Sequence, residues 1–335
     1  MATKTLVERS RSGLSAISNR CINFSVRALA KKMIDFSNLD LSQLNQFKSR
    51  YDAYIFDLDG CLISLDTGPI EGVNDALQEM ERNGKCIMVL TDNCLHTLSN
   101  LAEKVNGYFP AIRKENVMNS GRLVVSYLKN INFTKKIYVI GSESGVITDL
   151  KDNGFDVLYE KEQRNISISD LRETKFENDV KAVLIAGDYN FNYVKMFKAV
   201  NYLSDSKVLF LQSHFPIVVQ FNANIVLPAA GAIAECVKAA SGRKETICVG
   251  KGSEYSSKYL NSLGFEAHRC LFVGDDISID MVAGNMGGMD TMLVLTGKSK
   301  LETVEQAKSK NQENKIPTYY TNSVADLIKV FKFEG

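Results

Sequence analysis

The sequence lacks an excess of charge of either sign. Its 335 residues include 40 Lys and Arg against 39 Asp and Glu, so the formal net charge at pH 7 is +1. This balance gives no electrostatic reason to bind nucleic acid or an anionic membrane surface, and neither is expected as a partner. The chain also has no internal repeat and no low-complexity tract.

Patterned cysteines and long hydrophobic runs are missing as well. The seven cysteines are an odd number, and no CxxC pair or Cys/His cluster occurs. That pattern favours neither a disulfide framework nor a zinc site, and it is typical of a reducing, intracellular compartment. The most apolar stretch, residues 225–240, is interrupted by Pro228, Glu235 and Lys238. A membrane span is therefore excluded, and the protein is expected to be soluble.

The first 34 residues differ in composition from the rest of the chain. They carry seven Lys and Arg and several Ser, but only one acidic residue, Glu8. Such a composition is typical of a mitochondrial transit peptide, although a basic leader without a targeting role fits it equally well. The expected location is therefore the cytoplasm, or the mitochondrion if residues 1–34 act as a transit peptide.

From Tyr51 onward, short apolar runs alternate with helix-like segments. The pattern predicts strands at 54–56 and 86–90 with a helix at 73–80 between them, and a helical segment at 101–128 broken near Pro110. Further strands are predicted as far as residue 295, among them 225–227 and 247–251. Near-continuous apolar strands separated by helices predict an α/β fold whose parallel sheet is covered on both faces.

Polar side chains follow four of the predicted strands. These residues are Asp57 and Asp59, Thr91, Lys251, and Asp275 and Asp276. In a parallel sheet the carboxyl ends of the strands meet at one edge, and binding sites form there. The sequence therefore predicts an active site made of these side chains.

The residue types at these strand ends suit phosphoryl transfer. Carboxylates from two strand ends, with a backbone carbonyl, form the all-oxygen site that Mg²⁺ prefers. A hydroxyl and a lysine can donate to phosphate oxygens. One carboxylate can then attack phosphorus to form an aspartyl-phosphate, while a second one protonates the leaving oxygen and later activates water.

Four motifs together resemble those of the haloacid dehalogenase superfamily. The matching segments, in order and spacing, are Asp57–Gly60, Thr91, Lys251 and Gly274–Asp280. The chain is most similar to the branch of phosphoglycolate, pyridoxal and 4-nitrophenyl phosphatases and NagD, over residues 47–330. The resemblance implies a Rossmann-like core at 47–133 and 229–335, with an α/β cap inserted at 134–228. Such a cap closes over the site and often mediates homodimerisation.

The resemblance also implies roles for the acidic residues. Asp57 would be the nucleophile and a Mg²⁺ ligand, and Asp59 would be the general acid/base and give its backbone carbonyl to the metal. Asp275 would be a further Mg²⁺ ligand. Asp280 would position the metal shell or the motif lysine, although it could simply cap a helix, and Asp276 would support the site.

The phosphate-binding residues depart from the family pattern. Thr91, Asp92, Asn93 and Lys251 are expected to bind the transferring phosphate. Relatives usually have asparagine where this chain has Asp92, and an ionised carboxylate there would repel a phosphate dianion. The alternative is that Asp92 turns away to cap the following helix. In the cap, Gln212–Phe215 also replaces the segment usual in relatives.

Three functions fit the sequence. The favoured one is a Mg²⁺-dependent phosphomonoester hydrolase that acts on a small phosphorylated metabolite such as phosphoglycolate. The alternatives are a pseudo-phosphatase that binds a ligand or partner, and a protein phosphatase. The histidines add little: His214 lies where the cap should face the substrate but fits packing equally well, and His96 and His268 are interpreted as structural.

Overall fold

The computed structural model describes residues 33–161, 166–222 and 224–332. The expected leader lies outside these residues except at its end. Ile34 belongs to the short strand β1 (Ile34–Asp35), which pairs with β16 (Tyr319–Thr321). Ile34 is thus part of the folded sheet, and we propose that the leader ends before it, at residue 32 or 33. A targeting role for the preceding residues stays a prediction.

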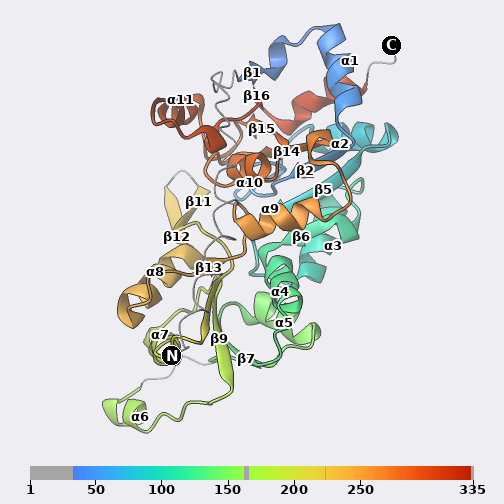
Figure 1. The fold of residues 1–335 in the computed structure, drawn as a ribbon. Helices are drawn as coiled ribbons and strands as arrows, with labels where there is room; N and C mark the ends of the chain where they lie inside the picture. Colours follow the sequence, from blue (N-terminus) through green and yellow to red (C-terminus); the bar gives the residue numbers. More distant parts are fainter. Residues whose placement is uncertain (1–32, 162–165, 223, 333–335) are drawn as a thin grey trace, which may run out of the picture. The chain divides into compact units, whose positions relative to one another are not determined.

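The first sheet has seven strands, and all neighbouring strands are parallel (Figure 1). Its order is β1-β16-β15-β14-β2-β5-β6. The strands not yet given are β2 (Ala53–Phe56), β5 (Cys86–Thr91), β6 (Val117–Asn119), β14 (Cys270–Gly274) and β15 (Asp290–Val294). Strand β2 lies between β14 and β5, so the residues that follow these three strands are brought to one edge of the sheet.

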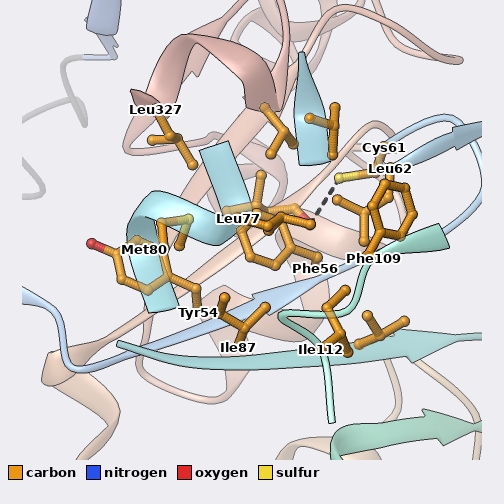
Figure 2. Packing of buried hydrophobic residues seen from close by; sticks show 14 of the residues in the cluster. Tyr54, Phe56, Cys61, Leu62, Leu77, Met80, Ile87, Phe109, Ile112 and Leu327 are labelled. Carbon is orange, nitrogen blue, oxygen red and sulfur yellow. Dashed lines mark hydrogen bonds between the residues drawn. The ribbon is translucent and has the colours of Figure 1, made fainter. Parts of the chain in front are cut away.

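The first sheet is buried on both faces, which explains its continuous apolar strands. In β2, Tyr54 and Phe56 join one hydrophobic cluster, whereas Ala53 and Ile55 join another. Leu77 packs in the first cluster, which Figure 2 shows from close by. Helices α1 (Leu41–Arg50), α2 (Val73–Arg82), α3 (Leu98–Tyr108) and α12 (Ile328–Phe331) contribute to that cluster, and α4 (Ser120–Asn130), α9 (Glu254–Asn261) and α10 (Asp280–Met286) to the other.

A second parallel sheet has the order β13-β10-β9-β7-β8. Its strands are β7 (Lys136–Ile140), β8 (Val157–Leu158), β9 (Val180–Ile185), β10 (Leu209–Gln212) and β13 (Ile247–Cys248). Side chains of α4 and α5 (Thr148–Asp152) pack on one face, and side chains of α7 (Tyr193–Tyr202) and α8 (Ala230–Ser241) pack on the other. The expected α/β fold with a second sheet as the cap is confirmed.

Two elements beyond residue 228, the expected end of the cap, join the second sheet. Strand β13 pairs with β10, and Ala230, Ile233 and Val237 of α8 belong to the hydrophobic cluster on one face of this sheet. The prediction assigned these elements to the core because their apolar pattern cannot show which sheet they join. We propose that the cap runs from Lys136 to Cys248.

Two local predictions also differ from the structure. The segment expected to be one broken helix contains α3 and α4, with the three-residue strand β6 between them. The apolar run at 225–227 forms β12 (Ile225–Pro228), which pairs antiparallel with β11 (Val218–Asn222) rather than joining a parallel sheet. The remaining strands and α-helices of the described residues are the β3 (Ile63–Ser64) and β4 (Gly68–Pro69) hairpin, α6 (Ile168–Arg172) and α11 (Leu301–Ser309). No described helix is both long enough and apolar enough to cross a membrane.

Candidate active site

Asp57 is held at the end of β2 by the sheet itself. Its backbone N–H donates to the carbonyl of Val273 in β14 at 2.8 Å. The following turn closes where Gly60 N–H donates to the Ile63 carbonyl at 2.7 Å. Gly60 has φ of 85°, and a Cβ there would lie 2.7 Å from an Asp275 carboxylate oxygen. Glycine is therefore required both by the turn and by the approach of Asp275.

Three carboxylates gather at this edge of the sheet. Asp57, Asp275 and Asp280 each offer an oxygen within 4.8 Å of the others, and all three are buried. Asp275 directly follows β14, and Asp280 opens helix α10. The Asp59 carboxylate is not in this group, which leaves its backbone carbonyl as the predicted metal ligand. Parallel pairing of β2 and β14 explains how residues more than 200 positions apart in sequence meet here.

Lys251 reaches the carboxylates from the second sheet. Its Nζ lies 2.6 Å from Asp57 Oδ1 and 2.7 Å from Asp280 Oδ1, and its side chain is 4% exposed. The sequence prediction treated Lys251 as the end of a strand in the same sheet as Asp57. That detail is wrong, because the preceding strand, β13, belongs to the second sheet. The chain segment that leaves the cap thus delivers the lysine to the core.

Asp280 organises the loop that carries Asp275. Its Oδ2 accepts from the backbone N–H groups of Asp275 at 3.0 Å and Asp276 at 2.9 Å, and its other oxygen faces Lys251. Asp280 thus does more than occupy the start of a helix. The Asp276 carboxylate instead accepts from Nζ of Lys298, in the loop after β15, at 2.6 Å.

The loop after β15 contributes contacts to which the sequence reasoning gave no role. The Lys298 backbone N–H donates to Asp275 Oδ2 at 2.6 Å, and Thr296 Oγ1 donates to the Gly60 carbonyl at 2.6 Å. A Cβ on Gly297 would lie 2.0 Å from the same Asp275 oxygen. The run Thr296–Gly297 is a sequence signal that could have pointed to this loop. Its closeness to Asp275 depends on strand order.

The segment after β5 lies between the core and the cap. Thr91 is buried, and its Oγ1 accepts from the Asn93 backbone N–H at 3.1 Å. Asp92 Oδ1 accepts from the Lys251 backbone N–H at 3.2 Å. The cap also holds this segment, because Val146 N–H donates to the Cys94 carbonyl at 3.1 Å. Asp92 is therefore in contact with the Lys251 backbone. Phosphate binding by Thr91, Asp92, Asn93 and Lys251 stays a prediction.

His214 is part of the packing beneath this segment. It is buried, its Nδ1 lies 2.8 Å from Ser213 Oγ, and its Nε2 accepts from the Ala230 N–H at 3.4 Å. These contacts support the packing interpretation of His214. His96, interpreted as structural, is instead exposed at the rim of a pocket.

That pocket opens beside Asp59 and has a volume of about 650 Å³. Asp59, Asn93 and Lys104 of α3 are among the residues that line it. The cap supplies Ser142, Ser144 and Tyr189 to the lining. The site thus has a buried carboxylate cluster and an adjoining space large enough for a small molecule.

Burial and mutual repulsion disfavour the charges on the carboxylates. Burial, together with repulsion from Asp280 and Asp57, holds the pKa of Asp275 well above its usual range. Burial raises the pKa of Asp280 to about 7, although Lys251 opposes the shift. Burial likewise raises the pKa values of Asp57 and Asp59. Burial alone would lower the pKa of Lys251, but the surrounding carboxylates outweigh it and raise that pKa well above normal.

Comparison with known proteins assigns this site to a family. Residues 54–156 match the model of a haloacid dehalogenase-like hydrolase, and residues 249–327 match a second model of the same kind. The chain is 32% identical to Phosphoglycolate phosphatase 2 of Arabidopsis thaliana over 302 residues, which cover 86% of this chain and 97% of that protein. The chain belongs to the haloacid dehalogenase-like hydrolases.

Two further phosphatases are similar to the chain over almost the same span. The 4-nitrophenylphosphatase of Schizosaccharomyces pombe is 27% identical, with 85% of this chain and 96% of that protein covered. The solved structure of a p-nitrophenyl phosphatase from Archaeoglobus fulgidus superposes with a TM-score of 0.69 at 22% identity, over 84% of this chain and 99% of that one. As a haloacid dehalogenase-like hydrolase with these relatives, the chain is a phosphatase, which confirms the expected enzyme class.

Proposed function

We propose that the protein is a Mg²⁺-dependent phosphomonoester hydrolase that works through an aspartyl-phosphate on Asp57. The observation that carries this proposal is the buried contact of Asp57 with Lys251, beside two more carboxylates and next to a pocket lined by Asp59. In the proposed reaction, the Lys251 contact would fix one Asp57 oxygen and supply a cation for the phosphate. The pocket that Asp59 lines would take the leaving group.

The chemistry requires two proton transfers by Asp59. In the first half-reaction, an Asp57 oxygen attacks phosphorus and the bond from phosphorus to the leaving oxygen breaks, while that oxygen takes the proton of Asp59. In the second, Asp59 accepts a proton from water, the water oxygen attacks phosphorus, and the bond to Asp57 breaks. Burial raises the pKa of Asp59, which favours the protonated carboxyl group that this step needs.

Lys251 and Thr91 are suited to hold the phosphoryl group. Lys251 is buried and its charge is stabilised by the carboxylates around it, so it remains a cation. Thr91 Oγ1 accepts from the Asn93 backbone N–H, which leaves its own hydroxyl proton available for donation. Two donors of fixed position can then balance negative charge on the phosphate oxygens.

The carboxylate cluster fits a divalent cation. Three carboxyl groups are buried together beside Lys251, and their raised pKa values reflect the cost of burying negative charge without a further cation. All the donor atoms are oxygens, the ligands that Mg²⁺ prefers. Asp57, Asp275 and the Asp59 carbonyl would hold the ion, with Asp280 fixing the Asp275 loop. When bound, Mg²⁺ supplies positive charge that neutralises the phosphate and lets the Asp57 carboxylate approach it.

The proposed substrate is a small phosphorylated metabolite such as phosphoglycolate. The pocket of about 650 Å³ suits a small molecule, and cap residues such as Tyr189 form part of its wall. The similarity to a phosphoglycolate phosphatase supports the same substrate class. A folded phosphoprotein would need more open access, so the pocket favours a metabolite over the protein-phosphatase alternative.

The test of this proposal is the substitution Asp57→Asn, with Asp66→Asn as the matched control. Asp66 is exposed in the β3–β4 hairpin, so its replacement makes the same chemical change away from the carboxylate cluster. With Mg²⁺ and 4-nitrophenyl phosphate, Asp57→Asn should lose all measurable turnover while keeping the thermal unfolding temperature of the native chain. Acid quenching of the native enzyme with radiolabelled substrate should trap a phosphoenzyme that hydroxylamine cleaves. Normal turnover by Asp57→Asn would reject the proposal.

We also propose that the protein forms a homodimer through the cap. The β11–β12 hairpin exposes a run of apolar side chains, with Ile217 58%, Val218 44% and Val226 54% exposed. A second copy of the chain could cover this hairpin at a symmetric interface. Light scattering should give a dimer mass for the native chain and a monomer mass for Val226→Lys. A native chain that stays monomeric at 100-fold higher concentration would contradict the proposal.

A further inference from the structure

The charged residues of the pocket are few and differ in sign. Within the described part of the chain, Asp59 is the single acidic residue of the lining, and Lys104 is its single Lys or Arg. His96 is the other basic side chain, and apolar residues such as Leu65 make up much of the remaining wall. An isolated ammonium group in such a wall can act as a specificity determinant, because it attracts an anion and contributes little to binding a neutral group.

Helix α3 presents Lys104 to the pocket. Asn100, Lys104 and Tyr108 follow one another at intervals of four residues, so they lie on one helix face, and all three are exposed pocket residues. Neighbouring Leu101 and Val105 are buried and fix the helix against the core. The position of the Lys104 backbone is therefore set by core packing.

Within the part of the chain that the structure describes, Lys104 forms no ion pair, whereas the adjacent Glu103 pairs with Lys114 at 3.5 Å. The Lys104 ammonium lies 6.0 Å from the centre of the Tyr108 ring. It is also close enough to Asp59 for its charge to lower the pKa of that carboxyl group, against the raising effect of burial.

These positions define where a leaving group would lie. In the proposed reaction, Asp59 protonates the leaving oxygen, so the organic part of the substrate extends from Asp59 into the pocket that Asp59 lines. Lys104 of α3 lines the same pocket, and its charge is opposite in sign to that of an ionised carboxylate. A substrate that carries an anion on its alcohol portion would place that anion in the field of this ammonium group.

We propose that Lys104 binds a second anionic group, a carboxylate, on the alcohol portion of the substrate and thereby selects phosphorylated hydroxy acids over neutral phosphomonoesters. The inference rests on the proposed function and adds to it the residue that sets the substrate class. Lys104 is a specificity residue here, and it takes no part in the transfer of the phosphoryl group.

The test compares two substrates that differ in one group. 2-Phosphoglycolate carries a carboxylate, and 2-hydroxyethyl phosphate has a neutral hydroxymethyl group in its place. Lys104→Gln is compared with Lys114→Gln, which removes the same charge from an exposed lysine outside the pocket lining. Lys104→Gln should lower kcat/KM for 2-phosphoglycolate about tenfold, which corresponds to about 1.4 kcal/mol, mainly through a higher KM. Its kcat/KM for 2-hydroxyethyl phosphate should stay within about twofold, and Lys114→Gln should change neither value.

Different outcomes separate this inference from the proposed function. Equal losses with both substrates, accompanied by a shifted pH profile, would mean that Lys104 acts on Asp59 and would overturn the inference. Unchanged values with both substrates would overturn it too. A native enzyme that hydrolyses neither substrate nor 4-nitrophenyl phosphate would reject the proposed function instead. Calorimetric binding of 2-phosphoglycolate then still tests Lys104, because equal affinity in the native chain and Lys104→Gln contradicts its role.

Discussion

Replacing Asp92 with asparagine separates the charge of this side chain from its hydrogen bond. Asp92 Oδ1 accepts from the Lys251 backbone N–H at 3.2 Å, and an asparagine oxygen can accept in the same place. The helix-capping alternative for Asp92 is wrong, because α3 begins at Leu98 with Thr97 as its cap. Repulsion between Asp92 and the phosphate therefore remains the prediction to test.

The size of the effect follows from the surroundings of Asp92. Burial raises the pKa of Asp92 from 3.8 to about 7, although Lys251 opposes the shift. A rise of about three pH units corresponds to about 4 kcal/mol against the ionised form. A phosphate dianion about 4 Å away would add repulsion of roughly 4 kcal/mol at an effective dielectric of 20, before Lys251 and Mg²⁺ offset it. A net penalty of only about 1.4 kcal/mol would cost a factor of ten in kcat/KM.

The pH dependence identifies the cause. Asp92 should be mostly neutral at about pH 5.5 and mostly ionised at about pH 8.5, because its pKa is about 7. Asp92→Asn should therefore raise kcat/KM for 4-nitrophenyl phosphate about tenfold at the higher pH and less than about twofold at the lower pH. Asp92→Ala also removes the acceptor for the Lys251 N–H, and it should lower the thermal unfolding temperature relative to Asp92→Asn.

Two results would refute this reasoning about Asp92. An unchanged or lower kcat/KM for Asp92→Asn at the higher pH would show that the charge does not oppose phosphate binding. Equal gains at both pH values would show that some property other than ionisation is responsible. Steady-state kinetics with saturating Mg²⁺ on both proteins, measured side by side, distinguish these results.

Three other predictions test the site and the chain ends. Gly297→Ala should lower activity at least about tenfold and raise the Mg²⁺ concentration required, because the new Cβ would lie 2.0 Å from Asp275 Oδ2. The control is Gly107→Ala, whose new Cβ would meet no atom within 4 Å. Equal activity of the two variants would contradict the crowding argument. In metal-free protein the raised pKa values of Asp280 and Asp92, both about 7, mean that the folded chain binds more protons than the unfolded chain. Stability should therefore fall as pH rises from about 4 to about 7, and Mg²⁺ should reduce that fall; scanning calorimetry in EDTA would disprove this if the unfolding temperature rose over the same range. Deletion of residues 1–32 should leave activity and unfolding temperature unchanged, and it should redirect a tagged protein in cells if this segment is a transit peptide. Deletion through Asp35 should also lower the unfolding temperature, because it removes β1. An unchanged location of the tagged protein would exclude the targeting role.

Much of the first sheet could be predicted from the sequence. The apolar runs that became β2 and β5 are continuous because both faces of the sheet are buried, and each run ends in a polar residue that is now at the site. Helix α2 was predictable for a related reason, since Val73, Ala76, Leu77 and Met80 are spaced so that one helix face is buried. These features depend on local patterns that survive any arrangement of the sheet.

The division between core and cap could not be predicted in the same way. Strand β13 has two residues and α8 is apolar on much of its surface, so neither pattern indicates which sheet it joins. Strand pairing puts β13 in the second sheet, and side-chain packing puts α8 on one face of that sheet. Lys251 therefore enters the site from the end of the second sheet. Short strands carry too little periodicity to specify a partner.

The chemical groups of the site can be read from the amino-acid sequence: the carboxylates Asp57, Asp59 and Asp275, the hydroxyl of Thr91 and the amine of Lys251, each next to an apolar run. The contacts that each group makes depend on the fold. In the folded chain, Asp92 accepts a hydrogen bond from the Lys251 amide, and the loop at Gly297 lies against Asp275. Lys104 of α3 lines the pocket beside Asp59. The physical reason is that residue spacing fixes which side chains share a local face, whereas contacts between distant segments depend on the order in which strands pair and helices pack.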